Sequence, residues 1–142
     1  MVENKLFIVD ASVALKWFLV EREGDLTQAF KVRDDFFNEQ IQLLVPMHFF
    51  VEFFNIVFRK VSSGALTSLS DLQKFSIPFV ALSLEIASIA GILMKKYPKV
   101  SFYDAFYHAL AIEKEGTFVT ADEQYYKMVK KEGHILLLKD YL

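Results

Sequence analysis

Short apolar runs alternate along the chain with longer segments of helical periodicity. The runs are apolar throughout, rather than alternating between apolar and polar positions, which is typical of strands buried on both faces. They predict strands over residues 5–9, 41–45, 77–82, 117–120 and 134–138. The segments between them predict helices over residues 10–17, 26–38, 48–61, 69–75, 83–97, 101–115 and 122–132.

This alternation predicts an α/β fold, a three-layer α/β/α sandwich with a mainly parallel sheet. Gly116 and Gly133 end two of the predicted helices and lead directly into strands. Each is therefore expected in the left-handed conformation that glycine adopts after a helix. Ligands of such folds bind beyond the carboxyl ends of the strands. Polar residues at that edge are the candidates for chemistry.

Length and composition narrow the possible functions. The 142 residues suit one domain, residues 1–142, and 54% apolar residues exclude intrinsic disorder. The 16 basic and 18 acidic residues give a net charge of −2, so nucleic acid would need a local basic patch or a metal ion. The absence of cysteine excludes thiol catalysis and cysteine-based zinc sites.

No targeting or membrane segment is expected. Glu3 and Asp10 interrupt the first apolar stretch, which therefore does not match a signal peptide. The most apolar window, residues 77–94, contains Pro78 and Glu85 and fits a strand and a helix better than a membrane span. The expected location is the cytoplasm.

Three aspartates occupy the predicted carboxyl edge, and each has a local structural explanation. Asp10 and Asp122 follow strands and suit helix N-caps. Asp104 lies three residues after Ser101, a spacing similar to a capping box. His108 follows Asp104 by one turn, and we expect it to be packed and hydrogen-bonded rather than to bind a metal.

Glu52 is harder to explain locally. Its helix is apolar on most faces, with His48, Glu52, Asn55 and Arg59 on one narrow stripe. A carboxylate on a largely buried helix needs a partner, because burying it alone is costly. The partner is either Arg59 or a lysine, or a cation that Glu52 shares with other acids.

Taken together, the four acids point to a cation. Carboxylates gathered at one edge repel one another unless they are protonated or share a divalent ion. Oxygen ligands without cysteine favour Mg²⁺ or Mn²⁺. Hard ions in such sites typically serve phosphoryl chemistry, in which they activate water and neutralise charge on the phosphate.

Four segments, in order, resemble the motifs of PIN-domain proteins, particularly the VapC-type ribonuclease toxins. The first runs from Phe7 through Asp10 to Phe18, and the second joins Pro46 to Glu52 and Asn55. The third and fourth are residues 101–111 and 118–123. No single motif is specific, but their order and spacing cover nearly the whole chain.

The resemblance implies a Mg²⁺- or Mn²⁺-dependent endoribonuclease, the toxin of a type II toxin–antitoxin pair. It also implies a homodimer and an antitoxin whose C-terminal segment covers the active site. By motif position the acidic site is Asp10, Glu52, Asp104 and Asp122, with Asp10 and Asp104 on the metal directly and Glu52 and Asp122 directly or through water. Ser12, Asn55 and Thr120 match polar positions that support the acids.

Other functions fit less well. Haloacid-dehalogenase phosphatases need a second aspartate where Ser12 stands, no glycine-rich phosphate loop follows the first strand, and no Asp ends a middle strand as in receiver domains. A PIN-like domain that binds RNA or protein without cleavage remains the alternative. The many phenylalanines of residues 49–58 either fill one core or bury part of a partner, such as a second copy or an antitoxin helix.

Overall fold

The molecule is built around one five-stranded sheet. The computed structural model describes residues 5–18, 25–60 and 65–142. All pairings are parallel, in the order β3-β2-β1-β4-β5. The strands are β1 (Lys5–Val9), β2 (Ile41–Pro46), β3 (Phe79–Val80), β4 (Thr117–Thr120) and β5 (Ile135–Leu137).

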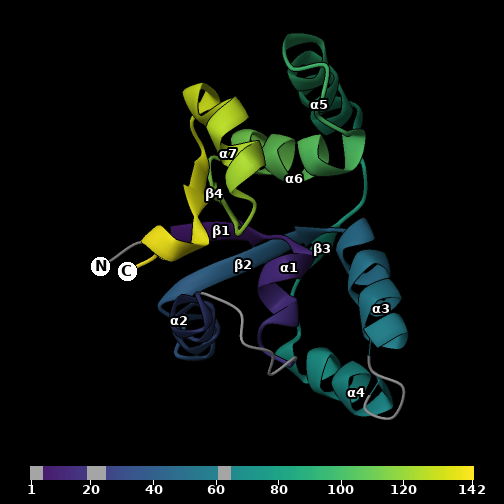
Figure 1. Cartoon of the computed structure of the whole chain (residues 1–142), viewed down its shortest axis with the longest axis vertical. Helices are drawn as coiled ribbons and strands as arrows, with labels where there is room; N and C mark the ends of the chain where they lie inside the picture. Colours follow the sequence, from purple (N-terminus) through teal and green to yellow (C-terminus); the bar gives the residue numbers. More distant parts are fainter. Residues whose placement is uncertain (1–4, 19–24, 61–64) are drawn as a thin grey trace.

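Helices cover both faces of this sheet (Figure 1). Helix α6 packs on β1, β2 and β4 with α5 outside it, whereas α1 and α2 lie on the opposite face. The three-layer α/β/α prediction is confirmed, with a sheet that is wholly parallel. The helices are α1 (Ala11–Leu15), α2 (Leu26–Phe37), α3 (His48–Lys60), α4 (Ala65–Phe75), α5 (Leu84–Lys96), α6 (Phe102–Glu113) and α7 (Glu123–Val129), and Lys130–Glu132 and Leu138–Asp140 form 3-10 turns.

Strand boundaries differ from the prediction at three places. Pro46 lies inside β2 rather than after it. The pairing of β2 with β1 ends at Leu44, opposite Ile8, so β1 offers no acceptor for the N–H that Pro46 lacks. The third strand shrinks to the two residues of β3. The last strand begins one residue late, because His134 has a positive φ of 56°.

Gly116 has a different role from the one predicted. The left-handed residue after α6 is Glu115, with φ 57°, and Gly116 itself has no positive φ. Instead, a Cβ at Gly116 would lie 2.8 Å from the backbone oxygen of Leu6, so glycine allows the chain to pass close to β1. Gly133 has the predicted positive φ, 71°, but its ψ of −170° is extended, so it does not adopt the left-handed helical conformation either.

The phenylalanines of α3 divide between core and surface. Phe49 and Phe53 are fully buried, Phe50 and Phe54 are half-buried, and Phe58 is 55% exposed. Only some of these rings therefore fill the core, and burial of the exposed ones against a partner stays a prediction. Helix α4 begins at Ala65 rather than residue 69, and the predicted loop at 62–64 lies outside the described residues.

No helix in the described part of the chain is long and apolar enough to cross a membrane.

Candidate active site

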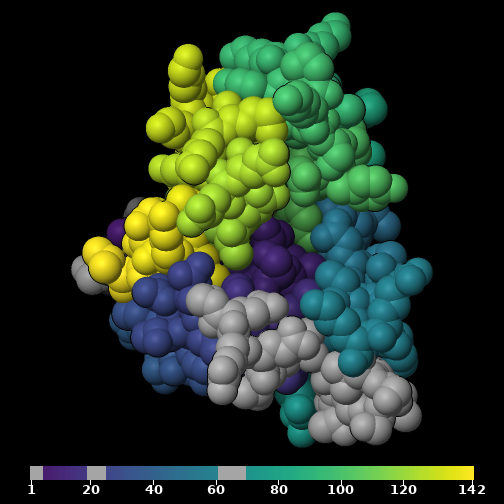
Figure 2. Space-filling model, in the orientation of Figure 1, coloured from purple at the N-terminus to yellow at the C-terminus, as the bar shows by residue number. Residues whose placement is uncertain are grey.

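The carboxyl ends of β1 and β4 lie side by side at the point where the strand order reverses. The chain runs from β1 outward to β2 and β3, then returns to place β4 on the other side of β1. Val9 pairs with Val119, so Asp10 and Thr120 follow at matching positions. Such a switch point is the usual ligand site of an open parallel sheet. In Figure 2 the purple N-terminal segment is visible between the segments of α3, α6 and α7.

Asp10 is held by donors from three residues. It caps α1, accepting the Val13 N–H on Oδ1 at 3.2 Å, and the Ser12 hydroxyl donates to the same oxygen. Thr120 donates to Oδ2 at 2.7 Å. The supporting roles predicted for Ser12 and Thr120 thus correspond to direct hydrogen bonds that fix the orientation of the Asp10 carboxylate.

Thr120 also connects Asp10 to Asp122. The hydroxyl oxygen of Thr120, which is almost fully buried, accepts the Asp122 N–H at 3.1 Å. Asp122 then caps α7 by accepting the Tyr125 N–H on Oδ1 at 3.0 Å. One side chain therefore sets the positions of two of the candidate acids.

Asp104 reaches the same edge from α6, the helix that packs on β1, β2 and β4. Ser101 caps this helix and accepts the Asp104 N–H at 3.2 Å. Ser101 also interacts with the exposed Asp104 carboxyl and lowers its pKa, which leaves the other acceptor positions of that carboxylate for further partners. The cap that the sequence suggested and a role in the site are compatible.

Glu52 has partners that the sequence did not indicate. The Tyr107 hydroxyl donates to Oε2 at 3.3 Å, and Nε2 of His48 lies 3.3 Å from Oε1. Arg59, the partner considered from the sequence, instead donates from Nε to Oδ1 of Asn55 at 3.1 Å. The one signal for Tyr107 was its spacing of three residues from Asp104, which places both on neighbouring positions of a helix.

The acids influence one another's protonation. Burial, and less strongly Asp104, raises the pKa of Asp10. Burial, followed by the charges of Asp10 and Asp104, raises the pKa of Glu52 to about 7. Burial and the charge of Asp122 raise the pKa of Asp104. The structure therefore brings all four acids into one electrostatically coupled set, a feature that is common at functional sites.

The donor chemistry of this set fits a hard divalent cation. All four side chains offer carboxylate oxygen. Burial is the main cause of the raised pKa values of Asp10, Glu52 and Asp104, and neighbouring acids add a repulsion that a cation would relieve. Within the described ranges, however, no three acidic or histidine side chains stand close enough together to enclose an ion.

Two other polar residues lie apart from the acids. Asn55 is exposed and bonded to Arg59, so no hydrogen bond in the described part of the chain joins it to the acidic set. His108 is fully buried, with its ring nitrogens 3.0 Å from the Tyr125 hydroxyl and 2.7 Å from the Gly133 carbonyl oxygen. The structural role expected for His108 is confirmed.

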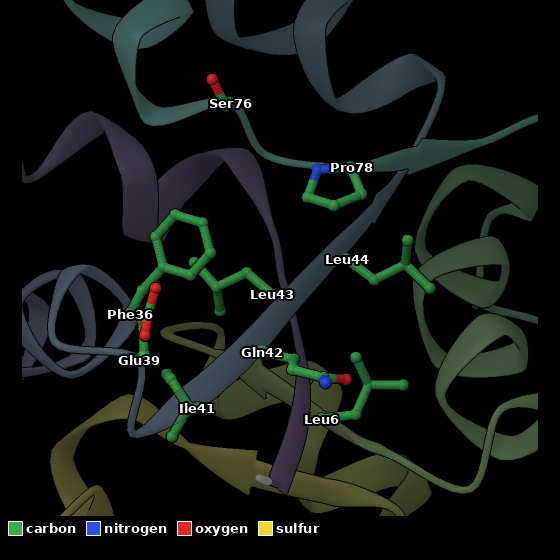
Figure 3. A pocket seen from close by; sticks show the side chains of 9 residues that line it. All are labelled: Leu6, Phe36, Glu39, Ile41, Gln42, Leu43, Leu44, Ser76 and Pro78. Atoms are coloured by element: carbon green, nitrogen blue, oxygen red, sulfur yellow. The ribbon is translucent and has the colours of Figure 1, made fainter.

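A groove of about 600 Å³ lies away from the acids, along the first half of β2 (Figure 3). Leu6, Leu43 and Leu44 contribute much of its apolar lining, and Glu39 is the one acid among the residues that line it. The candidate chemistry is therefore not in this groove but at the carboxyl edge of the sheet.

The fold and the site define a class of α/β/α proteins with coupled carboxylates at the switch point of a parallel sheet. The PIN domain family model matches residues 7–131, and the chain belongs to the PIN domain family. No curated protein matches the sequence significantly.

Solved structures with similar folds have low sequence identity. A toxin–antitoxin complex from Klebsiella pneumoniae superposes with a TM-score of 0.69 at 15% identity, covering 95% of this chain and 98% of that one. VapC20 of Mycobacterium tuberculosis, described as a sarcin-ricin loop cleaving toxin, gives 0.65 at 13%, covering 90% and 95%. VapBC2 of Rickettsia felis, bound to a promoter DNA fragment, gives 0.66 at 10%, covering 93% and 96%. At these identities the likeness establishes the fold.

Proposed function

We propose that this protein is a divalent-metal-dependent endoribonuclease that hydrolyses RNA phosphodiesters. The observation that supports it is the coupled set of four carboxylates at the switch point of a PIN domain. RNA is the favoured substrate because a structurally similar protein is described as a sarcin-ricin loop cleaving toxin. The net charge of −2 is consistent with a cation that mediates between an acidic site and a polyanion.

In this proposal Asp10 and Asp104 bind Mg²⁺ or Mn²⁺ directly, and Glu52 and Asp122 bind it directly or through water. The ion supplies charge neutralisation at the phosphate and lowers the pKa of water. Ser12 and Thr120 hold the Asp10 carboxylate in a fixed orientation through their hydroxyls. Preorganised ligands of this kind lower the cost of assembling the site for reaction.

Glu52 is the proposed general base. A base works best when its pKa lies near the working pH, and burial together with neighbouring acids raises that of Glu52 to about 7. Its carboxylate can then take a proton from water and release it again. Burial is the main cause of this shift in the metal-free protein, and the charges of Asp10 and Asp104 add to it until a cation neutralises them.

The biological setting of the proposal is a toxin–antitoxin pair in the cytoplasm. A Klebsiella pneumoniae complex and a Rickettsia felis pair of similar fold were solved as toxin–antitoxin assemblies. We propose an antitoxin protein as the partner of this chain, and a homodimer as the form in which it acts. Exposed apolar side chains on α3, among them Val51 and Phe58, are available for such contacts.

The first experiment is cleavage of a mixed RNA pool by the purified protein with Mg²⁺ or Mn²⁺ and with EDTA. Cleavage is expected with metal, and Asp10→Asn and Asp104→Asn are expected to abolish it. The matched control is Asp140→Asn, which changes an exposed aspartate beside Lys5 at the opposite end of β1. Circular dichroism of each variant verifies that the fold is retained.

One result would contradict the site assignment, and another would contradict the nuclease itself. Full cleavage by Asp104→Asn would contradict the site assignment, because the proposal places that carboxylate on the metal. If folded, metal-saturated wild type leaves every RNA in the pool intact, a PIN domain that binds RNA or protein without cleavage becomes the better description.

A further inference from the structure

Tyr107 is a side chain next to the four candidate acids, between Glu52 and the chain segment that follows Asp10. It is on α6, three residues after Asp104, and its side chain is almost fully buried. Its ring stacks on Phe118 of β4, with centroids 5.4 Å apart and planes 10° from parallel. The ring is therefore fixed against the sheet, and the hydroxyl has a defined place at the carboxyl edge.

The hydroxyl has two partners of opposite kinds. The backbone N–H of Ala11, the residue directly after Asp10, interacts with the hydroxyl oxygen and lowers the pKa of Tyr107. The hydroxyl donates to Oε2 of Glu52 at 3.3 Å. A tyrosine hydroxyl has a single proton, and burial together with the negative charge of Glu52 and Asp10 raises its pKa, so the hydroxyl keeps that proton. With Ala11 on the acceptor side, the proton is free to point at Glu52.

His48 lies beside the other oxygen of the Glu52 carboxyl group. Its Nε2 is buried, lies 3.3 Å from Oε1 of Glu52 and makes no hydrogen bond within the described residues. Its ring packs against that of Tyr107, with centroids 4.7 Å apart. Glu52 thus has Tyr107 at one oxygen and His48 at the other, which restricts rotation of the carboxyl group.

We infer that Tyr107 is a positioning residue that ties Glu52 of α3 to the start of α1 and so fixes its place relative to Asp10. The inference deepens the proposed function and rests on it. Residues that orient metal ligands typically change metal affinity or activity by about 10- to 100-fold when they are removed. In this inference Tyr107 acts through Glu52, to which its hydroxyl donates, and not as a ligand of the metal.

The test is Mn²⁺ affinity, measured by calorimetry without RNA, in wild type and Tyr107→Phe. Phenylalanine keeps the ring stacked on Phe118 and removes only the hydroxyl. The dissociation constant is expected to rise about 10- to 100-fold, and kcat for RNA cleavage is expected to fall while KM for RNA stays unchanged. Tyr141→Phe is the matched control, because it also deletes a tyrosine–carboxylate hydrogen bond, the 2.7 Å bond to Asp35, but at the opposite end of β1.

A double-mutant cycle separates action through Glu52 from loss of the Ala11 contact. Added to Glu52→Gln, the Tyr107→Phe change is expected to have little further effect on Mn²⁺ affinity. An equal loss in both backgrounds would overturn the inference, as would wild-type Mn²⁺ affinity in Tyr107→Phe. Absence of Mn²⁺ binding by wild type is a different result, since it would contradict the proposed function itself.

Discussion

At the scale of single residues, each aspartate of the candidate site has a structural role as well. Asp122 caps a helix through one carboxylate oxygen, and a carboxylate has two oxygens with about four acceptor positions. Asp104 is at a capped helix start, where Ser101 accepts its N–H and also interacts with its carboxyl group. An aspartate can therefore cap a helix and also belong to the candidate site. The capping contact holds the acid in place at the edge of the sheet.

Glu52 gives a prediction about pH. Its pKa of about 7 in the folded state lies above the ordinary 4.5, so the folded state holds a proton that the unfolded state releases between these values. The stability of the metal-free protein is therefore expected to fall as pH rises from about 4.5 to 7. Glu52→Gln, which cannot ionise, should match wild type at pH values below this range and exceed it above. Urea denaturation in EDTA at a series of pH values measures this.

The control for that series is Glu113→Gln, at the exposed end of α6. Asp10 and Asp104 also have raised pKa values, so Glu52→Gln should keep part of the pH dependence. If Glu52→Gln and wild type differ equally at every pH, the carboxyl of Glu52 does not hold a proton in the folded state, and its choice as general base loses its basis.

At the scale of elements, the sequence predicted what depends on neighbouring residues in the chain. The apolar runs of β1 and β4 and the Ser101 cap are local features, and each is found where expected. Pairing in space is not local. The two-residue length of β3 and the contact between Tyr107 and Glu52 depend on how α3, α6 and the sheet come together, and no short pattern records that.

The same limit applies to the site itself. Asp10 and Asp122 were predictable at the carboxyl edge because strands with helices between them run parallel, which gathers their ends. The pKa of Glu52 was not predictable, because it arises from burial and from charges on other elements. The predicted support from Asn55 remains a prediction, since the structure pairs that side chain with Arg59.

Two glycines give a prediction about how elements approach each other. Gly116→Ala would place a Cβ 2.8 Å from the Leu6 backbone oxygen, so the α6–β4 connection must move away from β1. A loss of about 1–3 kcal/mol in the free energy of unfolding is expected from such overpacking. Gly91→Ala, within α5 and with no atom within 4 Å of the new Cβ, should instead gain about 0.5–1 kcal/mol.

Chemical denaturation measures the free energy of unfolding of both variants and of wild type. Because the substitution is the same, any general effect of an added methyl group cancels in the comparison. Equal effects of the same sign would mean that the close approach at Gly116 does not restrict the chain.

At the scale of the whole molecule, the surface has apolar side chains that the core does not use. Val51 is 70% exposed and Phe58 55% exposed, and they lie two turns apart on α3. Phe79 and Leu84 are also largely exposed. Large apolar side chains gathered on one helix face are more typical of an interface than of a surface that stays in water.

The expected consequence is a dimer in solution. Light scattering of wild type should give twice the 16.4 kDa of one chain, and Val51→Asp should shift the mass toward that of one chain. Phe37→Asp, at an exposed position on α2, is the control and should leave the mass unchanged. A wild-type mass of one chain at all concentrations would contradict the homodimer and leave an antitoxin as the occupant of this face.

The hydrogen bond from Thr120 to Asp10 joins residues 110 positions apart. During translation, at about 5–20 residues per second, Asp10 is made about 5–20 s before its partner. Strand β1 has a free side throughout that interval, because β4 is its neighbour in the finished sheet. Until Thr120 has been synthesised, the chain on the ribosome lacks the contact that orients Asp10. The candidate site is therefore incomplete during that part of translation.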